Sequence, residues 1–137
     1  MGVLKTRKSI LLVEDDPDIS RSVAFRLRKQ GYEVRVVEDG KNGLAAALEN
    51  VPHLLILDLM LPLISGEEVC KALREHDDEK IQKIPIIMLT AKSSEADAIV
   101  GRIIGANYYM TKPFSMEDLV AKIEKMTAEK TPDERAG

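Results

Sequence analysis

Apolar and polar positions along the chain follow two alternating patterns. Short, mostly apolar runs are separated by longer stretches in which apolar residues recur every three or four positions, as on one face of a helix. Five runs are predicted to be strands: Ser9–Val13, Tyr32–Val37, His53–Leu57, Pro85–Thr90 and Asn107–Thr111. The second run alternates, which is typical of a strand near a sheet edge, whereas the first, third and fourth are apolar enough for central strands.

Helical periodicity follows each predicted strand. The first helix is expected over residues 17–30, and capping patterns at Ser65, Ser94 and Ser115 begin the last three. The apolar stripes of the five helices fall at Ile19, Val23 and Leu27; at Leu44, Ala47, Leu48 and Val51; around Cys70; at Ile99, Val100, Ile103 and Ile104; and at Met116, Leu119, Val120, Ile123 and Met126. Phe25 lies off the first stripe and is expected to be exposed.

Strict alternation of strands and helices predicts an α/β fold with a doubly wound five-stranded parallel sheet and helices on both faces. The expected boundaries are an N-terminal extension over 1–8, one domain over 9–129 and a flexible tail over 130–137. Sheets of this kind bind ligands at the carboxyl ends of their strands. The residues that follow each strand are therefore the candidate site.

Composition narrows the class of protein. The chain has 137 residues, 45% of them hydrophobic, and a net charge of -3, which fits one globular domain without direct nucleic-acid binding. A single cysteine excludes an internal disulfide and a multi-cysteine metal site. No signal core or membrane-length apolar run is present in the sequence, so we expect a cytoplasmic protein without membrane insertion.

Charged and hydroxyl side chains gather at the predicted strand ends. The residues concerned are Glu14, Asp15 and Asp16, then Asp58, Thr90 and Lys112. Carboxylates that cluster repel one another and are stabilised by a cation, and an all-oxygen ligand set suits a hard ion such as Mg²⁺. Asp16 precedes Pro17 and is predicted to cap the first helix, which leaves Glu14 and Asp15 for the site.

Asp58 is the most unusual of these residues, because it is the lone charge within the run "LLILDLMLP". A charge in apolar surroundings is costly unless it is paired. We therefore expect Asp58 just past the third strand, at the rim of the sheet, where a cation and Lys112 could keep it ionised.

Four motifs occur in order at four strand ends: "LLVEDDP", "LLILDLMLP", "PIIMLTA" and "GANYYMTKPF". In these motifs the chain resembles the receiver domain of two-component response regulators, as in single-receiver chemotaxis regulators, over residues 9 to about 128. The resemblance implies a flavodoxin-like fold with strand order 2-1-3-4-5.

The resemblance also implies roles for the acids at the strand ends. Asp58 matches the phosphoryl-accepting aspartate. Asp15, Asp58 and the backbone carbonyl of Met60 match the ligands of Mg²⁺, for which Mn²⁺ could substitute, and Glu14 would act on the metal through water.

A second group of residues matches the part of the family that senses phosphorylation. Thr90 matches the hydroxyl that contacts the phosphoryl group, and Ala91 the small residue that leaves room for it. Lys112 matches the lysine that pairs with the phosphoryl group, Pro113 the proline often joined to it by a cis bond, and Tyr109 the aromatic switch residue.

In this interpretation a histidine kinase or histidine phosphotransfer protein donates the phosphoryl group. The surface formed by the helix from Ser94, the fifth strand and the last helix would then change and control the binding of a protein target, with a phosphorylation-dependent homodimer as one form of output. The domain would be an acceptor and switch that assists only its own phosphorylation and dephosphorylation, not an enzyme.

Three other interpretations compete with this one. An aspartyl phosphatase of the haloacid dehalogenase type needs a second acid two residues after the nucleophile, where this chain has Met60. A dinucleotide-binding module needs a glycine-rich first turn, where this chain has "VEDDPD". A receiver that docks without phosphorylation is disfavoured by the full complement of site residues.

Overall fold

A computed structural model describes residues 7–91 and 105–128 of the chain. Within them lies a five-stranded, all-parallel sheet of order β2-β1-β3-β4-β5. The strands are β1 (Ser9–Val13), β2 (Glu33–Val37), β3 (Leu54–Asp58), β4 (Ile86–Ala91) and β5 (Tyr108–Lys112). The predicted flavodoxin-like architecture and strand order are confirmed.

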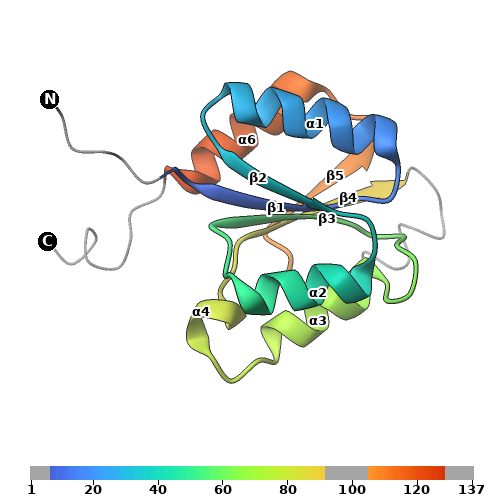
Figure 1. Cartoon of the computed structure of the whole chain (residues 1–137), viewed down its shortest axis with the longest axis vertical. Coiled ribbons are helices and arrows are strands. Elements are labelled where there is room, and N and C mark those ends of the chain that lie inside the picture. The colour runs from blue at the N-terminus through green and yellow to red at the C-terminus, as the bar shows by residue number, and fades with distance from the viewer. Residues whose placement is uncertain (1–6, 92–104, 129–137) are drawn as a thin grey trace, which may run out of the picture.

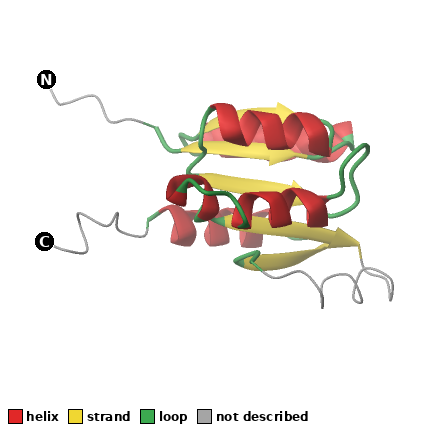
Figure 2. Cartoon of the chain, turned by 90° about the horizontal axis from the view of Figure 1, so that it is seen from below, coloured by secondary structure: helices red, strands yellow, loops and turns green. Residues whose placement is uncertain are grey.

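Helices cover both faces of the sheet. They are α1 (Pro17–Lys29), α2 (Gly40–Glu49), α3 (Gly66–Arg74), α4 (Glu79–Gln82) and α6 (Met116–Thr127). In Figure 1, α1 and α6 lie on one face and α2 and α3 on the other, and Figure 2 shows the same layers from below. The helix expected from Ser94 falls outside the described residues. None of the helices within the described ranges is long and apolar enough to cross a membrane.

Alternate residues of the central strands supply two separate cores. Ile10 and Leu12 of β1 pack in a cluster with Val23 and Leu27 of α1, which is shared with the apolar face of α6. The neighbouring Leu11 and Val13, with residues of β3, pack in a cluster with α2 and α3. Because β3 is buried on both faces, all five of its residues are buried, as expected of a central parallel strand.

The buried face of α2 differs from the prediction. Leu48 and Val51 are each 40% exposed, although both were expected on the apolar stripe. The helix packs instead through small residues, and a Cβ at Gly43 would stand 2.9 Å from Val13. Leu44 of the predicted stripe still packs partly against the core, but the close approach of the helix at its small residues leaves Leu48 facing outward.

Most of the predicted helix starts are confirmed. Asp16 caps α1 by accepting from the backbone N–H groups of Asp18 and Ile19. Ser65 and Glu68 form the predicted capping box of α3, and Ser115 accepts from the N–H of Asp118 at the start of α6. The short helix α4 was not predicted, because four residues show no helical period.

Candidate functional site

The carboxyl ends of β1, β3, β4 and β5 meet at one rim of the sheet, and the candidate residues gather there. Asp58 was expected just past its strand, and this is wrong: it is the last residue of β3 and pairs in register with Leu89 of β4. The next residue continues the ladder, since the N–H of Leu59 donates to the carbonyl of Leu89 over 2.9 Å. Asp58 is only 5% exposed, so it is a buried carboxylate.

Lys112 is the cation of this site. As the last residue of β5 it brings its Nζ 2.7 Å from Glu14 Oε1 and 3.2 Å from Asp58 Oδ2. Glu14 is fully buried, and its second oxygen accepts from the backbone N–H of Asp16 over 3.0 Å. A lysine held between two buried carboxylates leaves one net negative charge among the three groups, which favours a further cation.

The carboxylates are close enough to share a metal ion. One oxygen from each of Glu14, Asp15 and Asp58 lies within 4.8 Å of the other two, and Asp15 is exposed. Oxygen donors at this spacing fit Mg²⁺. The backbone of Met60 runs past the same carboxylate, because its N–H donates to Asp58 Oδ1 over 3.3 Å.

The site perturbs proton binding at two groups. Burial, reinforced by the negative charge of Glu14 and opposed by Lys112, raises the pKa of Asp58 from 3.8 to about 7. Burial alone would lower the pKa of Lys112, but the carboxylates of Glu14 and Asp58 outweigh it, so this pKa is raised. Lys112 therefore stays charged, whereas Asp58 needs a further cation to be fully ionised at neutral pH.

The loop between β3 and α3 is fixed at both ends by close backbone packing. The N–H of Gly66 donates to the carbonyl of Leu59, and a Cβ at Gly66 would stand 2.3 Å from the carbonyl oxygen of Asp58. At Gly40, the start of α2, a Cβ would meet the carbonyl oxygen of Ile64 at 1.7 Å. Glycine is required at both positions for the loop to lie where it does.

The remaining candidates lie along β4 and β5. Thr90 is 6% exposed and pairs with Thr111, while Ala91 is exposed beside Lys112. The peptide bond between Lys112 and Pro113 is cis. Tyr109 is half-buried against the core cluster that includes Cys70 and Leu73 of α3.

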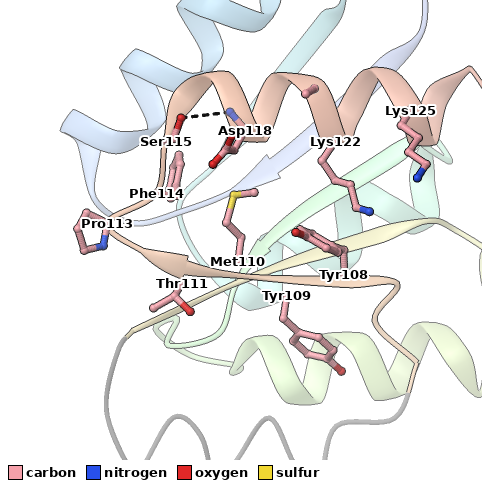
Figure 3. Close-up of a pocket in the computed structure, with 11 residues that line it drawn as sticks. Tyr108, Tyr109, Met110, Thr111, Pro113, Phe114, Ser115, Asp118, Lys122 and Lys125 are labelled. Carbon is pink, nitrogen blue, oxygen red and sulfur yellow. Dashed lines mark hydrogen bonds between the residues drawn. The ribbon is translucent and has the colours of Figure 1, made fainter.

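A surface hollow of about 510 Å³ lies between β5 and α6. Figure 3 shows Tyr108 and Tyr109 on opposite sides of β5, with only Tyr108 facing α6. The Lys122 ammonium stands 4.0 Å from the centre of the Tyr108 ring, a cation–π contact.

Two features of the site were missed from the sequence. The Glu14–Lys112 ion pair was not expected, although opposite charges at strand ends of one rim were a signal for it. The burial of Asp58 was underestimated, because the ladder to β4 continues past the last apolar residue of β3.

Known proteins resemble this chain in sequence and fold. A family model for the response regulator receiver domain matches residues 10–124. The sensory transduction protein RegX3 of Mycolicibacterium smegmatis is 41% identical over 129 residues, which are 94% of this chain and 54% of that protein. The chain thus spans about half the length of this curated relative.

Two solved structures have the same fold. The chemotaxis response regulator CheY4 of Vibrio cholerae is 30% identical with a TM-score of 0.76, over 88% of this chain and 99% of that one. The receiver domain of the sensor histidine kinase PA1611 from Pseudomonas aeruginosa PAO1, which has a magnesium ion coordinated in its active site cleft, is 28% identical with a TM-score of 0.80, over 90% of this chain and 100% of that one. Sequence and fold agree, and the chain belongs to the response regulator receiver domain family.

Proposed function

We propose that the chain is a phosphorylation-dependent switch in which Asp58 accepts a phosphoryl group from a histidine kinase or a histidine phosphotransfer protein. The observation that carries the proposal is the cluster at the rim: a buried aspartate contacted by a lysine, with two more acids within ligand distance. Phosphoryl transfer to a carboxylate requires mainly positioning and neutralisation of charge, and this cluster supplies both.

Asp58 is the nucleophile of the transfer. An oxygen of its carboxylate forms a bond to phosphorus while the bond from phosphorus to the donor's imidazole nitrogen breaks and its electron pair stays on that nitrogen. Lys112, 3.2 Å from Asp58 Oδ2, lies where it can pair with the incoming phosphoryl oxygens while Glu14 holds it from the other side. The N–H of Met60 fixes the orientation of the carboxylate.

Asp15, Asp58 and the carbonyl of Met60 would hold Mg²⁺ or Mn²⁺, with Glu14 contributing through water. The ion would neutralise charge on the transferred group. The magnesium in the cleft of the PA1611 receiver domain supports this assignment. The ion pair between Glu14 and Lys112 fits the same scheme, because it occupies one of the two Glu14 carboxylate oxygens.

The response to phosphorylation is assigned to Thr90 and Tyr109. Thr90 stands at the end of β4, next to the residue paired with Asp58, so its hydroxyl could reach a phosphoryl group at Asp58. Tyr109 is half-buried against the core cluster beside α3, at the boundary between the core and solvent. A change in its packing would bias two pre-existing states of the surface around β5 and α6 and so control a protein target.

Labelled phosphoramidate tests this function without a partner protein. In the presence of Mg²⁺ we expect label on the wild type, none on Asp58→Asn and normal incorporation into Thr90→Ala. Binding of the target, once identified by comparison of captures with and without beryllofluoride, should depend on phosphorylation in the wild type and only weakly in Thr90→Ala. Label on Asp58→Asn at the wild-type level would refute the assignment of Asp58.

A further inference from the structure

The backbone of Leu63 is strained. Within residues 7–91 and 105–128 it is the one non-glycine residue with a positive φ, +70°. The N–H of Ile64 donates to the carbonyl of Pro62 over 2.8 Å, so Leu63 is the central residue of a γ-turn. A γ-turn with positive φ at its centre is rare, and a bulky residue there is disfavoured by contact between its Cβ and the backbone.

The surrounding structure requires this turn. Gly40 donates its N–H to the same Pro62 carbonyl over 3.2 Å, and Gly66 closes the loop against Leu59. Backbone strain persists only where neighbouring contacts fix the conformation. These contacts account for the turn but not for a leucine in it, since asparagine or glycine would adopt the same φ with less strain.

The leucine side chain gains too little burial within this chain to offset the backbone strain. Leu63 is 76% exposed and Met60, on the same loop, is 52% exposed. The intervening Leu61, and Ile64 after the turn, pack partly against the core instead. The loop thus presents two apolar side chains to solvent and anchors itself through two others.

The location of the loop identifies what these side chains would meet. The Asp58 side chain is only 7% exposed, so a phosphohistidine must approach the rim closely before its phosphorus can bond to the carboxylate. The loop begins directly after Asp58 and is held at the rim by the bond from Gly66 to Leu59. A protein donor that reaches Asp58 must therefore cover this loop, whereas a small-molecule donor need not touch it.

We infer that Leu63, with Met60 beside it, is a specificity-determining contact for the protein phosphodonor and packs against an apolar patch next to the donor's histidine. The inference rests on the proposed function of Asp58. It predicts that Leu63 contributes to transfer from a protein and not to transfer from a small molecule.

The test compares Leu63→Asn, Leu63→Met and the wild type. Asparagine tolerates a positive φ but removes the apolar contact, whereas methionine keeps both the apolar character and the strain. Leu48→Gln, at another exposed leucine on α2, is the matched control. The donors are phosphoramidate and a phosphorylated histidine phosphotransfer domain chosen because it phosphorylates the wild type.

We expect Leu63→Asn to unfold at the same or a higher urea concentration than the wild type and to accept phosphate from phosphoramidate within about twofold of the wild-type rate. Its kcat/KM for transfer from the protein donor should fall about tenfold, mainly through KM, since burial of a leucine side chain changes affinity by about that factor or more. Leu63→Met keeps an apolar side chain at the contact, and Leu48→Gln changes a residue of another element, so both variants should stay within about twofold of the wild type.

Two results would overturn the inference: an unchanged kcat/KM of Leu63→Asn with the protein donor, or an equal loss with both donors. Failure of the wild type to accept phosphate from phosphoramidate at Asp58 would refute the proposed function itself. The small-molecule assay therefore distinguishes the two failures.

Discussion

Replacement of Asp58 by asparagine should stabilise the protein when no metal ion is present. The carboxylate is buried beside Glu14, and its pKa is raised from 3.8 to about 7. A carboxyl group whose pKa is higher in the folded than in the unfolded state binds more protons when folded, so the free energy of unfolding falls as pH rises between the two values. An asparagine side chain carries no charge, so the variant would not show this loss.

The magnitude follows from the size of the shift. A difference of one pKa unit corresponds to about 1.4 kcal/mol, so the shift at Asp58 sets an upper limit of roughly 4 kcal/mol at pH 8. The variant also loses the ion pair with Lys112, which keeps Glu14 at 2.7 Å. We therefore expect Asp58→Asn to be more stable than the wild type by about 1 to 4 kcal/mol at pH 8.

Urea denaturation with a chelator, at pH 5 and at pH 8, measures this difference directly. Other titrating groups, such as His53, are common to both proteins and largely cancel in the comparison. The advantage of Asp58→Asn should be large at pH 8 and smaller at pH 5, and excess Mg²⁺ should reduce it by stabilising the wild type more than the variant. If Asp58→Asn were no more stable than the wild type at pH 8, or if its extra stability did not increase from pH 5 to pH 8, Asp58 could not be a buried carboxylate whose ionised form is destabilised by its surroundings.

Three further predictions concern the neighbours of Asp58. Lys112→Met should lower the free energy of unfolding by about 3 kcal/mol at pH 8 in urea titrations, because it leaves the buried Glu14 carboxylate unpaired; the same stability as the wild type would contradict the ion pair. Mg²⁺ affinity, measured by calorimetry, should fall several-fold from pH 8 to pH 6 in the wild type, because protons compete for a carboxyl group with a pKa of about 7. Asp15→Asn should weaken Mg²⁺ binding at both pH values. An affinity that does not change with pH would contradict the assignment of Asp58 as a metal ligand. Gly40→Ala should lower the free energy of unfolding by at least about 2 kcal/mol in thermal or urea unfolding, since its Cβ would meet a backbone oxygen that cannot move freely. The control Ala45→Gly, on the same helix, should lower it by only about 1 kcal/mol. An equal effect of the two substitutions would argue against the close packing at Gly40.

The sheet could be predicted because its determinants are local in sequence. Apolar runs of strand length identify β1, β3 and β4 as central, and the cap at Asp16 follows from a short side chain before Pro17. The candidate site could be predicted because parallel strands bring their carboxyl ends to one rim. Each of these inferences needs only a few neighbouring residues.

Features that depend on distances between elements could not be predicted. The exposure of Leu48 arises because Gly40, Gly43 and the alanines of α2 let that helix approach the sheet. The positive φ of Leu63 arises from hydrogen bonds that join its loop to two helices. A leucine on an apolar stripe is expected to be buried, and a leucine in a loop is expected to have a negative φ. At Leu48 and Leu63, packing elsewhere in the chain overrides these preferences.

The proposed function depends on Asp58 itself carrying the phosphoryl group. It is tested most directly by incubating the wild type with phosphoramidate and Mg²⁺, trapping the acyl phosphate by borohydride reduction and locating the reduced residue by peptide mass spectrometry. We expect reduction at position 58 alone, dependent on Mg²⁺ and absent from unphosphorylated protein. Reduction at Asp15 or Glu14 in place of Asp58, or no reduced residue at all, would contradict it.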